Sequence, residues 1–375
     1  MRFLHLSDLH IGKRVNEFSM IEEQKYILNQ ILNVIDNERV ESVLIAGDIY
    51  DKSVPSAEAV LIFDEFLTNL ADRNLTVFVI SGNHDSPERI AFGNRLMKEC
   101  CVYMSPVFNG DIRPITLKDE YGSINIYMLP FIKPVNVKKV YPDAEADSYS
   151  DAVKFVIDKM DVNRSERNII VAHQLVTGAG RCDSEDISIG GMDNVDASVF
   201  EPFDYVALGH IHRPQSISRD TLRYSGTPLK YSFSEMNHNK SLTIVDMLEK
   251  GNISIDTSHI LVPEHDMREI RGRYMEITDR NFYIGTNIED YLHIVLEDEE
   301  DIPDVLGRLR SIYPNIMRLD YDNLRTRTNN DIDSASDLEE KNPMQLFEEF
   351  FRLQNNADMN SRQRELIEGI IEDIF

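Results

Sequence analysis

The sequence predicts an α/β fold. Short runs of β-branched and aromatic residues, such as 42–46 and 76–80, alternate with longer segments whose apolar residues recur at helical spacing, such as 20–37. Several of the short runs are followed at once by Gly, Asp, Asn or His. In open α/β sheets, functional sites form at the carboxyl ends of the strands. Together these observations predict a site assembled where several strands end.

The individual elements are delimited by ordinary start and stop signals. The second helix begins near Ser56, just past Pro55, and the third opens with Pro87 at its first turn, where the missing N–H needs no partner. The predicted helices span 20–37, 56–73, 87–98 and 151–160, and the clearest strands span 2–6, 42–46, 76–80, 124–129, 168–172, 204–208, 222–225, 241–246 and 253–259.

Length and composition limit the class of protein. The chain has 375 residues, enough for two domains, and 42% of them are hydrophobic, enough for a sizeable core. Its net charge of -26 argues against a surface that attracts nucleic acid everywhere, but leaves open a local basic groove, a basic partner or simple solubility. Scarce cysteines, no apolar run of membrane-spanning length and no signal-peptide pattern predict a cytoplasmic protein.

The stretch 81–85 is the most informative part of the sequence. It follows the strand 76–80, and Gly82 permits the sharp turn that the chain must make there. Taken alone, an amide, an imidazole and a carboxylate at a turn could serve structure only. The other strand ends carry matching groups, which favours one shared site. The strand-end residues are Asp8, His10, Asp48, Asn83, His84, His173, His210 and His212.

The donor chemistry of this set predicts a metal centre. Seven of these eight residues, taken as oxygen and nitrogen ligands, exceed the needs of one ion and suit two, and a carboxylate can bridge two cations about 3.5–4 Å apart. Mixed imidazole and carboxylate ligation favours manganese, iron or zinc over calcium or an all-oxygen magnesium site.

Five sequence blocks, in this order, resemble the calcineurin-like metallophosphoesterase superfamily: Asp8-x-His10, Gly47-Asp48-x-x-Asp51, Gly82-Asn83-His84-Asp85, His173 and Gly209-His210-x-His212. The resemblance implies a four-layer αββα sandwich with a two-metal site at the strand ends. It also implies a division of the ligands. One ion would be held by Asp8, His10 and His212, the other by Asn83, His173 and His210, and Asp48 would bridge them.

The same resemblance leaves His84 without a metal and implies that it acts as a general acid toward the leaving oxygen. A histidine in that role needs an orienting acid. Asp51 is the expected partner, with Asp85 as the alternative. The Ser/Thr phosphatases carry Gly-Asp-x-x-Asp-Arg-Gly, whereas Lys52 and Ser53 follow here, which disfavours that branch.

Further blocks resemble the SbcD family of bacterial DNA-repair nuclease subunits. They are Asp183-Ser184-Glu185, the run from Gly209 through Gln215 to Glu235, and the Phe-rich segment 346–351. This resemblance implies a manganese-dependent nuclease with 3′–5′ double-strand exonuclease and single-strand endonuclease activity, acting in DNA end processing, hairpin cleavage and repair. It further implies a coiled-coil ATPase partner of the SbcC type in a two-plus-two assembly, with the nuclease domains forming a homodimer.

The chain is expected to divide into four parts: a nuclease domain at 1–265, a small α+β capping domain at 266–330, a linker at 331–342 and C-terminal helices at 343–375. The tail helices carry wide apolar stripes, which would dock either on the body of the chain or in a groove of the ATPase. In the capping domain, Arg268, Arg271 and Arg273 either contact DNA or form a solvated face.

Two other functions fit parts of the sequence. A small-substrate metallophosphodiesterase or phosphatase would share the metal ligands, so the ligands alone do not exclude it. A non-catalytic scaffold for the ATPase is disfavoured by the intact ligand set and by His84.

Overall fold

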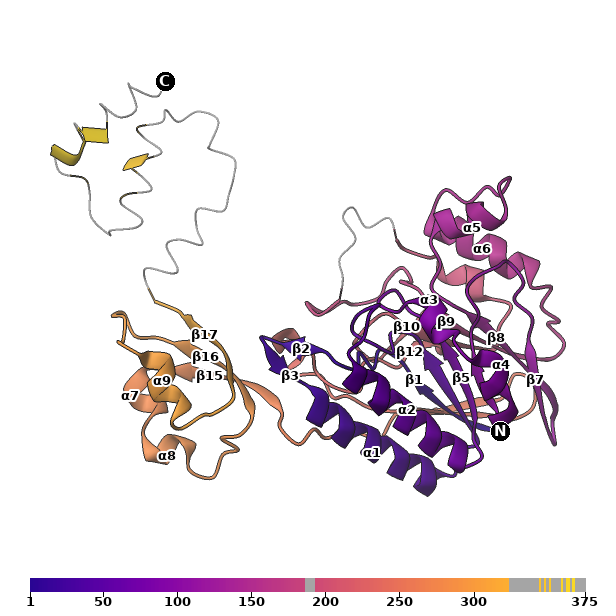
Figure 1. Ribbon diagram of the computed structural model, residues 1–375, viewed down its shortest axis with the longest axis horizontal. Helices are drawn as coiled ribbons and strands as arrows, with labels where there is room; N and C mark the ends of the chain where they lie inside the picture. Colours follow the sequence, from indigo (N-terminus) through magenta and orange to yellow (C-terminus); the bar gives the residue numbers. More distant parts are fainter. Residues whose placement is uncertain are drawn as a thin grey trace. The chain divides into compact units, whose positions relative to one another are not determined.

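The computed structural model describes residues 1–185 and 193–323, and isolated positions of the tail at 344, 347, 348, 351, 359, 362–364, 366 and 367 (Figure 1). The chain divides into two compact units, Met1–Asp266 and Met267–Phe375. The predicted linker at 331–342 lies outside the described residues, and so does most of the predicted tail at 343–375. No helix in the described parts is long and apolar enough to cross a membrane.

The first unit is built on two six-stranded sheets. In the first sheet β1, β4, β5 and β6 run parallel, and β13 and β14 add an antiparallel pair at one edge. In the order β14-β13-β1-β4-β5-β6 the strands span Ile253–Asp256, Thr243–Met247, Arg2–Leu6, Ser42–Ala46, Thr76–Ile80 and Val102–Met104.

In the second sheet β8, β9, β10 and β12 run parallel, and the edge strands β7 and β11 are antiparallel to their neighbours. In the order β11-β12-β10-β9-β8-β7 the strands span Gln215–Ile217, Arg219–Tyr224, Tyr205–Gly209, Arg167–His173, Gly122–Leu129 and Ile115–Asp119. A separate hairpin joins β2 (Arg14–Val15) to β3 (Phe18–Ser19).

A continuous apolar core lies between the two sheets. It includes Phe3, Leu44 and Phe78 from the first sheet and Ile169 and Tyr205 from the second, all fully buried. All five residues of β4 are buried, because one face of the strand meets this core and the other meets the outer helices.

Helices cover the outer faces of both sheets. Figure 1 shows α1 (Ile21–Glu38) and α2 (Ala57–Asp72) along the first sheet. On the second sheet, Val153 and Ile157 of α6 (Tyr149–Lys159) share a core with Ile170 and Val206. The predicted αββα fold class is therefore confirmed. The remaining short helices of this unit are α3 (Pro87–Ile90), α4 (Asn94–Met97), α5 (Pro134–Val140), η1 (Lys98–Cys100), η2 (Ala197–Phe200) and η3 (Phe233–Glu235).

The prediction of one helix over 87–98 was wrong. The structure has two separate turns, α3 and α4, divided by Gly93, whose φ is +73°. That left-handed conformation ends a right-handed helix, and glycine adopts it without steric cost.

A polar network joins the two sheets at one edge of the interface between them. The Arg167 guanidinium donates to the Asp119 carboxylate and to the carbonyl oxygens of Met247 and Leu248. The terminal ammonium group of Met1 donates to Asp119 as well, at 3.1 Å. Asp119 and Arg167 belong to the second sheet, whereas Met247 ends a strand of the first, so this network links the sheets by charge-assisted hydrogen bonds.

The second unit contains a three-stranded parallel sheet, β15-β16-β17, spanning Met267–Gly272, Tyr291–Leu296 and Ile316–Tyr321. Its helices α7 (Tyr274–Ile277), α8 (Arg280–Tyr283) and α9 (Val305–Arg310) lie in the connections between the strands. Ile277, Leu292, Leu309 and Tyr313 belong to its small core, and the Tyr313 hydroxyl donates to the Ile277 carbonyl at 2.7 Å.

Candidate metal centre

The predicted ligands meet at the carboxyl ends of the parallel strands. Asp8, Asp48 and Asn83 follow β1, β4 and β5 of the first sheet. His173 is the last residue of β9, and His210 follows β10 in the second sheet. Because neighbouring parallel strands end together, as Gly209 and His173 do, the loops that leave them place their side chains in one region.

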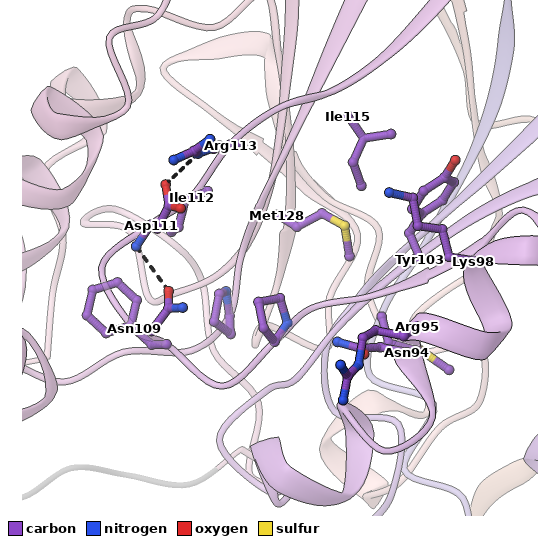
Figure 2. A pocket seen from close by; sticks show the side chains of 14 residues that line it. Asn94, Arg95, Lys98, Tyr103, Asn109, Asp111, Ile112, Arg113, Ile115 and Met128 are labelled. Atoms are coloured by element: carbon purple, nitrogen blue, oxygen red, sulfur yellow. Dashed lines mark hydrogen bonds and ion pairs between the residues drawn. The ribbon is translucent and has the colours of Figure 1, made fainter.

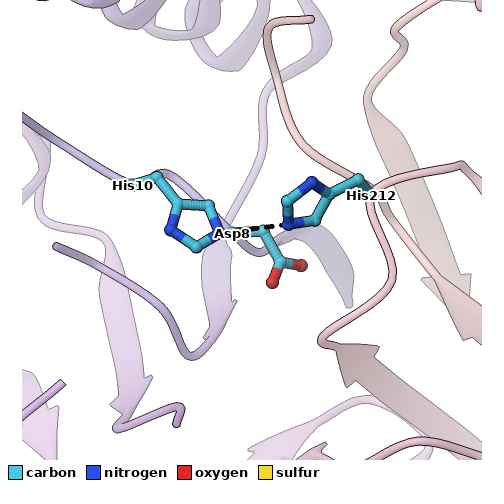
Figure 3. A group of neighbouring side chains, drawn as sticks. All are labelled: Asp8, His10 and His212. Atoms are coloured by element: carbon cyan, nitrogen blue, oxygen red, sulfur yellow. Dashed lines mark hydrogen bonds between the residues drawn. The ribbon is translucent and has the colours of Figure 1, made fainter. Parts of the chain in front are cut away.

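One group of ligands consists of Asp8, His10 and His212 (Figure 3). All three residues are buried, and their ligand atoms lie within 4.8 Å of one another. The two Nε2 atoms of His10 and His212 are 3.1 Å apart. Burial lowers the pKa of both imidazoles well below the usual value, so both rings are neutral. Two neutral imidazoles and a carboxylate that converge in this way suit a single cation.

A second group surrounds Asn83. Its Oδ1 atom lies 2.9 Å from His173 Nε2 and 2.9 Å from His210 Nδ1. Burial lowers the pKa of His210 to about 3. Burial also opposes the charged form of His173, but the nearby Asp48 carboxylate outweighs it and raises the His173 pKa to about 9. The charge that retains a proton on His173 equally favours a cation at that position.

Asp48 lies between the two groups. Its Oδ2 atom is 3.3 Å from His173 Nε2, 3.7 Å from His10 Nε2 and 4.0 Å from His84 Nε2. Its other oxygen accepts the main-chain N–H of His84 at 2.9 Å. Burial disfavours the charged form, but the imidazole of His173 and its neighbours hold the pKa of Asp48 below its ordinary value. The carboxylate is therefore ionised and adjoins both ligand groups, as a bridging ligand requires.

No lysine or arginine among the described residues pairs with the buried carboxylates Asp8 and Asp48. Among the described residues, the ion pairs of Asp48 are all with histidines, and Asp8 forms none. Burial raises the pKa of Asp8 to about 7. Buried charges in proteins are paired or coordinate metals. The donor set thus fits divalent cations, whose positive charge would stabilise both carboxylates.

The ligand loops adopt unusual backbone conformations. Asp8, His10, Asp48 and His210 have positive φ values of 53°, 45°, 51° and 104°. Such conformations are unfavourable for residues other than glycine and persist where surrounding structure enforces them, often at functional sites. Glycine at position 82 allows the loop after β5 to lie directly against Asp48, since a Cβ atom on Gly82 would lie 2.1 Å from Asp48 Oδ1.

The side chain of His84 is 20% exposed, unlike the buried ligands Asp8, His10, Asp48, His173 and His212. Its Nδ1 atom lies 3.0 Å from the main-chain carbonyl oxygen of Asp51. A carbonyl only accepts, so Nδ1 carries the hydrogen and Nε2 is the nitrogen closer to Asp48. The Asp51 carboxylate accepts from Lys13 at 2.8 Å. Asp51 was expected to orient His84 with its carboxylate, but the contact is made by its main-chain carbonyl, because the carboxylate pairs with Lys13.

Asp85, the alternative partner of His84, has another role. Its carboxylate accepts the main-chain N–H groups of Ile49, Tyr50 and Gly82 at 3.1, 3.0 and 2.9 Å. These bonds fasten the loop after β5 to the loop after β4. Asp85 therefore holds the ligand loops together from beneath.

Sequence reasoning missed a group of polar residues behind His212. Ser184 Oγ lies 2.6 Å from His212 Nδ1, and the Glu185 carboxylate accepts the main-chain N–H of His212 at 2.7 Å. Glu235 and Lys240, both buried, lie behind Ser184. The sequence signals were the block 183–185 and the run that ends at Glu235, and neither gave any indication of which atoms these residues contact.

A separate cavity of about 290 Å³ lies near β6 and β8 (Figure 2). Its lining includes Lys98, Tyr103, Ile115 and Met128. None of the predicted metal ligands lines it, so it is distinct from the metal centre.

Comparisons with known proteins identify the family of the chain. Residues 1–214 match the family model of the calcineurin-like phosphoesterases, and residues 263–355 match the model described as the type 5 capsule protein repressor C-terminal domain. A relative from Staphylococcus epidermidis, named as the SbcD subunit of the nuclease SbcCD, is 32% identical over 323 residues, which cover 85% of each protein.

Solved structures also resemble the chain. GAP50, the anchor in the inner membrane complex of Plasmodium, aligns with a TM-score of 0.45 and 12% identity, over 85% of this chain and 96% of that one. A dimetal phosphatase from Danio rerio aligns with a TM-score of 0.40 and 11% identity, over 70% of this chain and 97% of that one.

The matched family model covers more than half of the chain, and the relative is similar along most of both sequences. The chain therefore belongs to the calcineurin-like phosphoesterases and, among them, to the SbcD family of nuclease subunits.

Proposed function

We propose that this chain is the nuclease subunit of an SbcCD-type complex and hydrolyses DNA phosphodiester bonds with two divalent ions. The observation that carries the proposal is the convergence of ligands from both sheets around the ionised, buried Asp48. The proposed activities are 3′–5′ exonuclease on duplex DNA and endonuclease on single strands, which serve end processing, hairpin cleavage and repair.

The ligand assignment follows the two groups. Asp8, His10 and His212 would hold one ion, Asn83, His173 and His210 the other, and Asp48 both. When bound, the ions supply Lewis-acid charge to the phosphoryl oxygens and activate water. Imidazole and carboxylate donors together favour manganese, iron or zinc over calcium, and the resemblance to the SbcD family makes manganese the proposed metal.

His84 is the proposed general acid. The Asp51 carbonyl fixes the Nδ1 hydrogen, so the ring presents its Nε2 atom toward the metal centre. From there, a protonated His84 can donate to the leaving oxygen. Its partial exposure lets it meet a substrate, whereas five of the proposed ligands, Asp8, His10, Asp48, His173 and His212, are buried. A well-placed general acid contributes roughly 10²–10⁴-fold to a rate.

The proposed partners are DNA, a second copy of this chain, and an SbcC-type ATPase in a two-plus-two complex. The relative's name describes it as one subunit of SbcCD. The same proposal includes the domain limits 1–265, 266–330, 331–342 and 343–375. The segment 343–375 is proposed to bind the ATPase, and the complex is proposed to act in the cytoplasm. Arg268 and Arg271 pair with Asp290 and Asp322, which favours a solvated face over DNA contact for both.

The decisive experiment uses full-length protein purified with its ATPase, labelled DNA with free or blocked ends, and manganese. His84→Gln should lower cleavage at least 100-fold while two manganese ions remain bound, because His84 is proposed as a proton donor and not a ligand. His259→Gln is the matched control. His259 contacts Glu38 and Asp256 on the surface, and its loss should leave cleavage unchanged.

The same assay separates the other functions. Hydrolysis of a chromogenic phosphodiester but never of DNA, with the ATPase present, would identify a small-substrate enzyme. Hydrolysis of neither would identify a scaffold. Undiminished cleavage by Asp48→Asn at saturating manganese would refute the two-metal mechanism.

A further inference from the structure

Hydrogen bonds hold both the main chain and the ring of the proposed ligand His212. Lys240 Nζ donates to its main-chain carbonyl at 2.9 Å, and Glu185 accepts its main-chain N–H at 2.7 Å. Its ring nitrogen Nδ1 lies 2.6 Å from Ser184 Oγ. Main chain and ring are thus held independently of any ion.

Ser184 connects the ring to a buried acid. Its hydroxyl also lies 2.5 Å from Glu235 Oε1. Glu235 is fully buried and pairs with Lys240, whose ammonium group is 2.5 Å from Oε2. Burial opposes the charged form of Glu235, but Lys240 and other donors outweigh it and lower the pKa of this carboxyl. Glu235 is therefore a carboxylate and can only accept hydrogen bonds.

The number of available hydrogens fixes the direction of the two hydrogen bonds of Ser184, one with Glu235 and one with His212. A serine hydroxyl has one hydrogen, and the carboxylate of Glu235 must receive it. The hydroxyl oxygen then accepts from His212, so Nδ1 of the ring carries the hydrogen. The other nitrogen, Nε2, is left with a free lone pair. This is the atom that lies 3.1 Å from His10 Nε2 in the ligand group of Asp8, His10 and His212.

We propose that Ser184 and Glu235 are positioning residues that hold His212 in the tautomer able to bind metal. They thereby set the affinity of the ion held by Asp8, His10 and His212, and leave the ion at Asn83, His173 and His210 largely unaffected. The inference rests on the two-metal centre of the proposed function. Partners of this kind behind a ligating histidine typically change metal affinity about 10- to 100-fold.

The test is a manganese titration of the full-length protein without DNA. Binding is monitored through the electron paramagnetic resonance signal of the free manganese ion. Ser184→Ala should weaken one of two sites about 10- to 100-fold and leave the other as in the wild type. Ser184→Thr keeps the hydroxyl and should restore binding. Ser232→Ala is the matched control, because Ser232 also donates to Glu235 Oε1, at 3.2 Å, without being the hydroxyl that meets His212.

A second measurement observes the tautomer directly. In metal-free, ¹⁵N-histidine-labelled protein, the His212 signals, assigned by their loss in His212→Gln, should report hydrogen on Nδ1. In Ser184→Ala the hydrogen should shift toward Nε2. Urea unfolding of the same samples should show that both variants remain folded.

The outcomes separate the two proposals. Unchanged manganese binding by Ser184→Ala, equal weakening by Ser232→Ala, or hydrogen on Nε2 in the wild type overturns the positioning role while the proposed function stands. A wild-type protein that binds no manganese at all overturns the metal centre of the proposed function.

Discussion

Asp85 and Asp48 are two buried carboxylates with different structural roles. Asp48 faces the histidines, whereas Asp85 accepts three main-chain N–H groups from the loops that carry the ligands. An ionised carboxylate has enough lone pairs for three donors. A carboxamide has one acceptor oxygen, and its NH₂ group would face an N–H group. The ligand loops therefore depend on the chemistry of Asp85 as well as on its size.

Asp85→Asn is expected to lower the free energy of unfolding by about 1–3 kcal/mol, the usual cost of leaving buried donors unsatisfied. Urea denaturation of the metal-free protein measures this loss. Asp111→Asn is the control, because Asp111 is exposed and contacts Arg113 on the surface. Equal stability of the two variants would contradict the role given to Asp85.

The residues predicted for the site were those whose chemistry is visible at strand ends. Asp8, His10 and their counterparts follow strands that periodicity identifies, and the structure brings them together. The chain behind His212 could not be predicted in this way. Ser184, His212 and Glu235 are separated by 28 and 23 residues, and only the folded chain brings their side chains into contact. The main-chain contact of Asp51 with His84 was also beyond prediction, because every residue has a carbonyl.

At the scale of elements, α1 anchors the chain just before the second unit. Glu23 on this helix is buried and accepts the main-chain N–H groups of Glu264 and His265 at 3.0 and 3.2 Å. It also accepts from His265 Nδ1 at 2.6 Å. The sequence predicted the helix from its apolar stripe, but a glutamate among the apolar positions gave no sign that it binds residues 264–265. The split of the predicted helix 87–98 was missed because a glycine such as Gly93 is tolerated within helices, so the sequence does not show that it adopts a left-handed conformation here.

Glu23→Gln should speed amide exchange at 264–265 and lower the free energy of unfolding by about 1–2 kcal/mol, since an amide replaces a charged acceptor of three donors. Hydrogen exchange followed by mass spectrometry measures the first effect. Glu22→Gln is the control on the same helix. Glu22 is exposed and pairs with Lys25, so its exchange pattern should match the wild type. Identical exchange in both variants would exclude the anchor.

At the scale of the whole first unit, Asp119 and Arg167 connect the two sheets. The hydrogen bonds of Arg167 hold the pKa of Asp119 well below its ordinary value. A carboxyl with a lowered pKa in the folded state stabilises the protein when the pH is above the pKa of the unfolded chain, about 3.9. That stabilisation is lost as the pH falls toward the folded-state value.

Asp119→Asn is therefore expected to lower the free energy of unfolding by about 2 kcal/mol at pH 7, in the range for hydrogen bonds to charged groups. The difference from the wild type should shrink as the pH falls below about 4. Urea denaturation at a series of pH values measures it. If the difference in free energy of unfolding between the two proteins stays constant down to pH 2, the charge of Asp119 does not contribute to stability.

The ligands of the metal centre come from both sheets, and this division has a consequence for the protein during its synthesis. Asp8, His10, Asp48 and Asn83 follow strands of the first sheet, whereas His173 ends a strand of the second sheet and His210 and His212 follow another. Chains emerge from the ribosome N-terminal end first. A nascent chain shorter than 212 residues therefore holds an incomplete ligand set. The proposed two-metal centre therefore cannot assemble before the strands of both sheets that carry its ligands have been synthesised.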